Sequence, residues 1–161
     1  MPAPPTWSLV VSLPSDREIR MIRSFRAPRE LVFKAHIDPE HLRRWWGPRA
    51  ATLAVCDLEL RPAGRYRFVC REPDGTEHAF RGEYLRIEPP ALLEYTFEYE
   101  GFPGHVSVET LTFEEAAGIT TLTSNTVYAS RDDRDATLQS GMESGAAESM
   151  DRLEELLRLI A

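Results

Sequence analysis

The stretch DPEHLRRWWGP at residues 38–48 decides how the chain around it folds. Asp38 is a favoured N-cap, and Pro39 suits the first helical position because an N–H there would have no partner. The closing Gly-Pro cannot continue a helix, so the stretch predicts a short helix that ends at two adjacent tryptophans. Side chains of that size need a surface to cover them. We expect Trp45 and Trp46 to be at least partly buried, either as a structural anchor or as the lip of a ligand pocket.

Upstream of this helix, the sequence predicts a strand followed by another helix. Residues 17–25 alternate in character, with Ile19, Met21 and Arg23 on one face, which is typical of a strand. A proline then opens the helix predicted at residues 28–35, where the apolar side chains form one patch.

Downstream, apolar and polar residues alternate in a series of strands separated by turn signals. One of these turns is an Asp-Gly pair, a strong hairpin signal. The predicted strands cover residues 54–60, 65–71, 78–87, 93–99, 105–115 and 119–128. The face of the first strand that we expect to be buried carries Ala54, Cys56, Leu58 and Leu60. The face of the second strand that we expect in solvent, or against an acidic partner, carries Arg65, Arg67 and Arg71.

The turn at residues 61–64 sets the register of the two strands beside it. It places Cys56 nearly opposite Cys70, with both thiols on the inward face. Cβ atoms at that spacing are slightly too far apart for a disulfide, and a reducing compartment keeps thiols free. We therefore expect two free, buried cysteines.

The C-terminal segment changes to a helical period. Ser130, with Asp133 three residues later, resembles a capping box, and apolar or small residues then recur at three- and four-residue steps. This predicts one long amphipathic helix, bent near Gly141. The fold class is therefore α+β: a curved antiparallel sheet of about seven strands wraps around the C-terminal helix and leaves a cavity between them.

Length and charge restrict the class of function. The chain has 161 residues, which suits one domain at 17–161 after an N-terminal extension at 1–16. Its net charge is −7 and it has no basic tract, so we expect no nucleic-acid partner. No apolar run is long enough to cross a membrane, and the extension lacks the basic start of a secretory signal. We expect a cytoplasmic monomer or homodimer.

The motifs exclude several kinds of chemistry. The two cysteines and four histidines are scattered, without CxxC spacing or a Cys/His cluster, so we expect no metal site. The glycine-rich nucleotide fingerprints, the GxSxG elbow and the HExxH helix are also missing from the sequence. We expect no bound cofactor.

Several segments, taken in order, resemble a known family. They are REI at 17–19, APRELVF at 27–33, the tryptophan stretch at 38–48, RPAGRY at 61–66, FEE at 113–115 and MDRL at 150–153. Together they resemble the bacterial proteins similar to the C-terminal domain of the activator of heat-shock-protein-90 ATPase. Those proteins belong to the START-like (SRPBCC) superfamily, so the resemblance implies a helix-grip fold over residues 17–157. The superfamily includes lipid and polyketide carriers, cyclases and co-chaperone domains, and its fold does not fix an activity.

The resemblance also draws attention to the final helix. Family members commonly carry a Gly-Trp pair there, whereas this chain has Gly145 and Ala146. The missing indole implies either that another aromatic side chain fills the space or that the ligand cavity is larger. Strand alternation also places polar groups in the predicted cavity. If Leu111 points inward, then Glu109 and His105 on the same strand point inward as well. A buried Glu109 would need a partner or a shifted pKa; the alternative places it at the rim, in solvent. The candidate cavity residues are Trp46, Tyr66, Phe68, Phe80, Tyr84, Tyr95, Phe97, His105, Glu109, Leu111, Ser124, Thr126, Met142, Gly145, Ala146 and Ser149.

Three functions follow as hypotheses. The first is binding of a hydrophobic or amphipathic small molecule in the cavity, and the second is a co-chaperone-like module whose partner is a chaperone or another protein. The third is a cyclase or dehydratase type of enzyme with Glu109 or a pocket tyrosine as general base. A cavity without convergent polar groups would favour binding or a structural role, and a deep pocket in which Glu109 faces His105 or Tyr95 would favour chemistry. A flat apolar patch outside the cavity would favour a protein partner.

Overall fold

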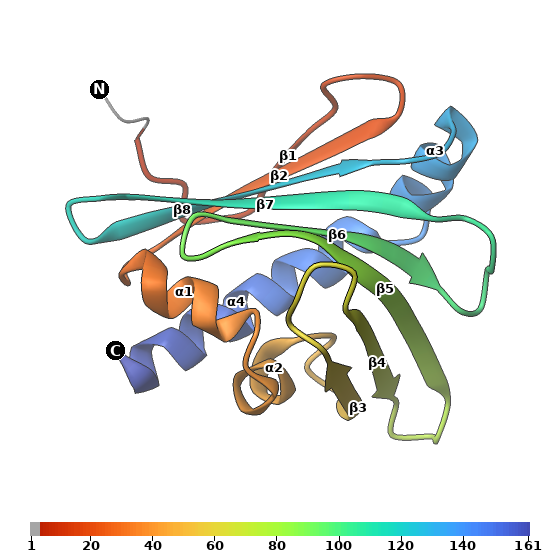
Figure 1. The fold of residues 1–161 in the computed structure, drawn as a ribbon, viewed down its shortest axis with the longest axis horizontal. Coiled ribbons are helices and arrows are strands. Elements are labelled where there is room, and N and C mark those ends of the chain that lie inside the picture. The colour runs from red at the N-terminus through yellow and green to blue at the C-terminus, as the bar shows by residue number, and fades with distance from the viewer. Residues whose placement is uncertain (1–3) are drawn as a thin grey trace.

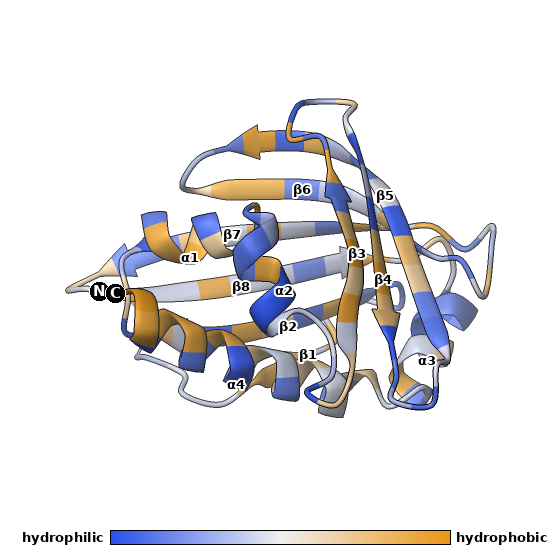
Figure 2. Ribbon diagram, turned by 90° about the horizontal axis from the view of Figure 1, so that it is seen from below, coloured by the Kyte–Doolittle hydropathy of each residue, from blue (hydrophilic) through white to orange (hydrophobic). Residues whose placement is uncertain are grey.

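The structure, a computed structural model, describes residues 4–161. Its strands are β1 (Val10–Ser12), β2 (Glu18–Phe25), β3 (Thr52–Leu58), β4 (Arg65–Arg71), β5 (Glu77–Glu88), β6 (Leu92–Tyr99), β7 (Ser107–Ala116) and β8 (Ile119–Val127). Within the described residues these strands form one antiparallel sheet in the order β1-β2-β8-β7-β6-β5-β4-β3. Figure 2 shows that β3 and β4 run across the direction of β7 and β8, so the sheet is strongly curved.

The helices lie on the concave side of this sheet (Figure 1). They are α1 (Arg29–Ala35), α2 (Pro39–Trp45), α3 (Arg131–Gln139) and α4 (Met142–Ile160). The long helix α4 crosses beneath the sheet, α1 and α2 lie beside it, and α3 lies at the opposite end from the C-terminus. The predicted α+β helix-grip architecture is confirmed. No helix in the described part of the chain is long and apolar enough to span a membrane.

Helix α2 begins and ends as the tryptophan stretch predicts. The Asp38 carboxylate accepts a hydrogen bond from the backbone N–H of Glu40 at 2.9 Å, and a proline occupies the first turn. The backbone turns extended at Trp46, and Gly47 follows at φ +93°. A Cβ atom on Gly47 would lie 2.8 Å from Sγ of Cys70, so both the conformation and the space require glycine. The paired tryptophans are therefore held at a fixed exit from the helix.

The two tryptophans occupy different environments. Trp45 is buried, at 3 % exposure, and its indole N–H donates to the carbonyl of Ala35 at 2.8 Å. The ring of His36 lies edge-on between Trp45 and Phe113, at centroid distances of 4.8 and 5.3 Å. Trp46 is half-buried and packs against the core cluster. The expectation of at least partial burial is confirmed for both.

The C-terminal half of α4 holds the helix against the sheet. Leu153, Leu156 and Leu157 are its buried residues. The guanidinium of Arg23 on β2, itself 2 % exposed, donates to Asp151 at 2.9 Å and to Glu154 at 3.0 Å. The N-terminal half of α4 contributes no buried residue among those described. The helix is therefore anchored at one end and raised from the sheet at the other.

The C-terminal segment forms two helices, so the prediction of one continuous helix was wrong. The Ser130 hydroxyl accepts from the N–H of Asp133 at 3.1 Å, which confirms the predicted start. Helix α3 then ends at Gln139, and Gly141 adopts the left-handed conformation at φ +83°. A left-handed residue cannot continue an α-helix, so the chain changes direction there instead of bending.

The register of β3 also differs from the prediction. Next to the turn, Leu58 lies opposite Tyr66 and Cys56 lies opposite Phe68. A β-bulge between Leu53 and Val55 then places Leu53, instead of Ala54, opposite Cys70. Leu53 is buried in place of Ala54, because the extra residue in the bulged strand changes its phase. Leu60, predicted inward, follows the end of β3 and is 38 % exposed.

The predicted pairing of the two cysteines was wrong, because the connection between β3 and β4 places Leu58 opposite Tyr66 and therefore Cys56 opposite Phe68. Within the described residues both are nevertheless free and buried, as expected. Burial raises the pKa of each thiol to about 11.

The N-terminal stretch is tied to the sheet. Strand β1 pairs with β2, and the N–H of Thr6 donates to the hydroxyl of Ser24 at 2.9 Å. The sequence predicted this segment as an extension without a strand; its first three residues lie outside the described part. At the other edge the predicted outer face of β4 is confirmed, since Arg67 and Arg71 are exposed and pair with Glu100 and Glu77.

Replacing Trp45 by alanine tests the anchor. We expect Trp45→Ala to lower the free energy of unfolding by about 3–5 kcal/mol, because a buried indole is lost together with its hydrogen bond. Leu159→Ala is the control: Leu159 is 71 % exposed, and its truncation should change stability by less than about 0.5 kcal/mol. Urea titration measures both. A loss below about 1 kcal/mol for Trp45→Ala would contradict its role as an anchor.

Candidate functional site

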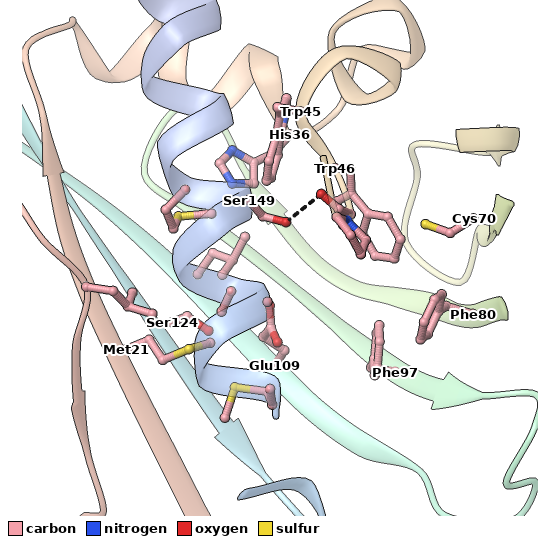
Figure 3. Close-up of a pocket in the computed structure, with 18 of the residues that line it drawn as sticks. Met21, His36, Trp45, Trp46, Cys70, Phe80, Phe97, Glu109, Ser124 and Ser149 are labelled. Carbon is pink, nitrogen blue, oxygen red and sulfur yellow. Dashed lines mark hydrogen bonds between the residues drawn. The ribbon is translucent and has the colours of Figure 1, made fainter. Parts of the chain in front are cut away.

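A cavity of about 370 Å³ lies between the raised half of α4 and the sheet (Figure 3). We call it the inner cavity. The candidate residues predicted from the sequence that line it are Trp46, Phe80, Tyr95, Phe97, Glu109, Leu111, Ser124, Met142, Gly145, Ala146 and Ser149. They come from the end of α2, four strands of the sheet and α4, so the cavity forms only when the sheet curls around the helix.

The remaining candidates lie in two adjoining hollows. Tyr66, Phe68 and Tyr84 border a small hollow of about 40 Å³ behind Trp46. His105 and Thr126 border a hollow of about 640 Å³ between α3 and the sheet, which we call the outer groove. The inner cavity and the outer groove share wall residues, namely Met21, Pro48, His78, Phe80, Phe97, Glu109 and Met142. The structure thus divides the predicted set into one central group and two flanking groups.

Sequence reasoning missed part of the wall. The additional lining residues are Leu9, Met21, Arg23, His36, Trp45, Gly47, Pro48, Ala51, Cys70, Glu72, His78, Leu122 and Met150. Met21, Arg23 and Leu122 share an inward strand phase with predicted core residues, and that signal would have found them. The loop residue Pro48 and the helix residue His36 give no such signal, because their place depends on how α1 and α2 meet the sheet.

One wall of the inner cavity is aromatic. Trp46 lies edge-on to Phe80 at 5.3 Å between ring centroids, and Phe80 stacks on Phe97 at 5.4 Å. Figure 3 shows these three rings on the side of the cavity away from β2. We call them the aromatic wall. Edge-on and stacked geometries are the favoured arrangements of aromatic rings, so the wall presents a defined apolar surface.

The roof of the cavity is formed by α4, where the small residues Gly145, Ala146 and Ser149 lie between Met142 and Met150. In the described structure, a Cβ atom on Gly145 would meet no heavy atom within 4 Å beyond its neighbours in the helix. Ser149 fixes the roof, because its hydroxyl donates to the carbonyl of Gly47 at 3.1 Å, drawn as a dashed line in Figure 3. Arg152 donates to the same carbonyl at 2.8 Å and to that of Arg44 at 3.0 Å. The space below Gly145 is therefore open although the backbone around it is tied down.

The floor carries a carboxyl group. Glu109 on β7 accepts a hydrogen bond from the Tyr95 hydroxyl at 2.5 Å and another from the Thr126 hydroxyl at 3.1 Å. Burial raises the pKa of Glu109, and the two hydrogen bonds oppose that rise. Burial also raises the pKa of Tyr95 well above 10, so its hydroxyl stays protonated and can only donate to the carboxylate. Glu109 thus faces Tyr95, which is the arrangement that favours chemistry, and it is half-buried where the inner cavity meets the outer groove.

His105 takes no part in this contact. Its Nδ1 lies 2.7 Å from the carboxylate of Asp133 on α3, and its ring stacks on Phe102 at 3.8 Å between centroids. This pair connects the β6–β7 loop to α3 beside the outer groove. His105 is therefore a residue of the groove edge and does not contact Glu109.

The arrangement allows hydrogen bonding and proton transfer at one point of an apolar cavity. Glu109 can accept hydrogen bonds or a proton, and Tyr95 can hold its carboxylate in place. In residues 4–161, no group of three or more His, Cys, Asp or Glu side chains is placed to hold a metal ion.

Comparison with known proteins finds a matching family and similar solved structures. The model of the activator of Hsp90 ATPase homolog 1-like proteins matches residues 26–158. A crystal structure of a Rhodobacter sphaeroides protein has 26 % identity, a TM-score of 0.89, and coverage of 94 % of this chain and 99 % of its own. Protein Ms6760 from Mycobacterium smegmatis has 27 % identity, a TM-score of 0.82, and coverage of 92 % and 96 %. No curated protein matches the sequence.

The half-buried carboxyl of Glu109 predicts a dependence of stability on pH. Folding raises the pKa of Glu109 above its ordinary value of 4.5, so its contribution to stability is lost as the pH rises from 4.5 through the folded pKa. Glu109→Gln removes this loss, and we expect the variant to gain stability over the wild type between pH 4 and pH 8. Urea titrations at both pH values measure the gain. The control Glu114→Gln alters an exposed carboxyl on the same strand and should show no such trend; an equal trend in both variants would contradict the assignment.

Proposed function

The chain belongs to the family of activator of Hsp90 ATPase homolog 1-like proteins, and from this premise we propose that it binds a hydrophobic or amphipathic small molecule in the inner cavity. The observation that carries the proposal is the combination of an aromatic wall with a glycine and alanine roof over open space. Ligand pockets are concave, mainly apolar, and hold a few polar groups that orient the ligand. The inner cavity has each of these properties, and Glu109 and Ser124 are among its polar groups.

Native mass spectrometry of protein purified from its own host tests this proposal directly. A small molecule that is retained in gentle conditions and released by unfolding supports it. Retention of a protein partner without a small molecule would favour the co-chaperone-like alternative.

Filling the roof is the sharpest test by mutation. We expect Ala146→Trp to fold and to weaken binding of Nile red, an uncharged dye, at least ten-fold, because an indole there occupies the space of the ligand. Ser144→Trp places the same side chain on an exposed position of α4 and should leave dye binding unchanged. Overpacking costs about 1–3 kcal/mol, so urea titration shows whether the variant remains folded. A folded Ala146→Trp protein with unchanged dye affinity would refute binding in this cavity.

A second candidate, acid–base chemistry in the same cavity, is favoured by the contact between Tyr95 and Glu109. Glu109 would take a proton from a substrate, and Tyr95 would orient it. Mass spectrometry of the captured molecule during incubation with the protein tests this. Conversion that is lost in Glu109→Gln and kept in Glu114→Gln would establish it, whereas an unchanged mass would leave binding as the function.

A further inference from the structure

Two polar side chains meet on the floor of the inner cavity, beneath α4. In the pairing of β7 with β8, Leu111 lies opposite Ser124 and Glu109 lies opposite Thr126, so Glu109 and Ser124 are diagonal neighbours. Figure 3 shows both side chains under the helix. Ser124 is 8 % exposed, and its hydroxyl has no hydrogen-bond partner among the described residues. Buried polar groups in folded proteins are normally paired, so an unpaired hydroxyl in a cavity indicates the position of a ligand's polar group.

Among the side chains that line the cavity, Arg23 is paired with carboxylates, whereas the carboxylate of Glu109 has no cationic partner in the described part of the chain. Arg23 faces two carboxylates on α4, those of Asp151 and Glu154. Burial lowers the pKa of His36 to about 4, so this histidine is neutral at pH 7. Glu109 accepts hydrogen bonds from two hydroxyl groups, and no ion pair in the described residues includes it.

The lining of the cavity includes a second carboxylate. Glu72 lies there beside His78, with 3.5 Å between carboxylate oxygen and Nε2. The cavity therefore presents a carboxyl group without a cation to match it.

We propose that the inner cavity selects an amphipathic amine, whose ammonium group lies between Glu109 and Ser124 and whose apolar part lies along the aromatic wall. This inference rests on the proposed function, since it names the class of molecule that the cavity binds. A protonated amine supplies the positive charge that Glu109 lacks, and an opposite charge within about 4–6 Å favours the ionised carboxylate. The binding of the amine would therefore offset the penalty that burial imposes on this group.

The hydrogen-bonding capacity of each group supports the same choice. Each oxygen of Glu109 accepts one hydrogen bond and has capacity for another, and the Ser124 oxygen can also accept. An ammonium group has three donors, enough for both residues. An alcohol has a single donor. A carboxylate has none and would face Glu109 with like charge, although the Arg23 Nε–H and the Ser124 hydroxyl, both without a partner among the described residues, could donate to it.

Three probes of equal chain length test the inference: octylamine, octanol and octanoate, each titrated against protein that carries Nile red. We expect octylamine to displace the dye at a concentration at least ten-fold lower than octanol, and octanoate to be the weakest. In Glu109→Gln the advantage of octylamine over octanol should disappear, because the carboxylate that pairs with the amine is gone while the size of the side chain is kept. Glu114→Gln, which removes an exposed carboxyl on the same strand, should retain the advantage.

The outcomes separate this inference from the proposed function. If octanol or octanoate displaces the dye as well as octylamine does, the cavity binds apolar chains and the choice of an amine is wrong. The same conclusion follows if Glu109→Gln retains the full advantage of octylamine while remaining folded by urea titration. If the dye itself binds equally well to wild-type protein and to folded Ala146→Trp, the proposed function fails, whatever the order of the three probes.

Discussion

The guanidinium of Arg23 joins the sheet to α4, and the shape of the site depends on that contact. Arg23 lies on the concave face of β2 and reaches Asp151 and Glu154 on the helix. The guanidinium is buried while its two acidic partners are partly exposed, so the helix must keep at least one acid beside Arg23 to avoid an unpaired buried charge. The leucines next to the two acids are buried on the sheet. Together they fix the C-terminal half of α4 and allow its first turns to stand away from the strands.

The inner cavity follows from this one-sided attachment. A helix packed on a sheet along its whole length would exclude a ligand, because interiors are close-packed. Here the first turns carry glycine and alanine, and hydrogen bonds from Ser149 and Arg152 to the loop after α2 prevent them from collapsing onto the sheet. The loop in turn is fixed by Gly47, whose left-handed backbone has no room for a side chain. The tryptophan stretch thus shapes the cavity at two points, through Trp46 in its wall and through the carbonyl that supports its roof.

Much of this architecture could be predicted from the sequence, because strand alternation and helix caps are local signals. The caps at Asp38 and Ser130 were predicted correctly for that reason. The bulge at Leu53 could not be predicted, since one extra residue in a strand leaves no mark on its composition, and it places Leu53 instead of Ala54 opposite Cys70. The register set by the connection between β3 and β4 was also missed, so Cys56 lies opposite Phe68 and not opposite Cys70. Which inward residues share one cavity depends on the curvature of the whole sheet, and a single strand carries no information about that.

The unfilled roof has a thermodynamic consequence that connects stability to function. Atoms that line an apolar cavity lack the contacts they would make in a packed core, so the folded state is less stable than its size permits. A molecule that binds only the folded protein restores stability, by about 2.7 kcal/mol when its concentration is a hundred times its Kd. Gly145 and Ala146 lie on the first turns of α4, the part of that helix that contributes no buried residue in the described structure. The ligand would therefore add its contacts where the protein's own are fewest, and it would order the helix turns that cover it.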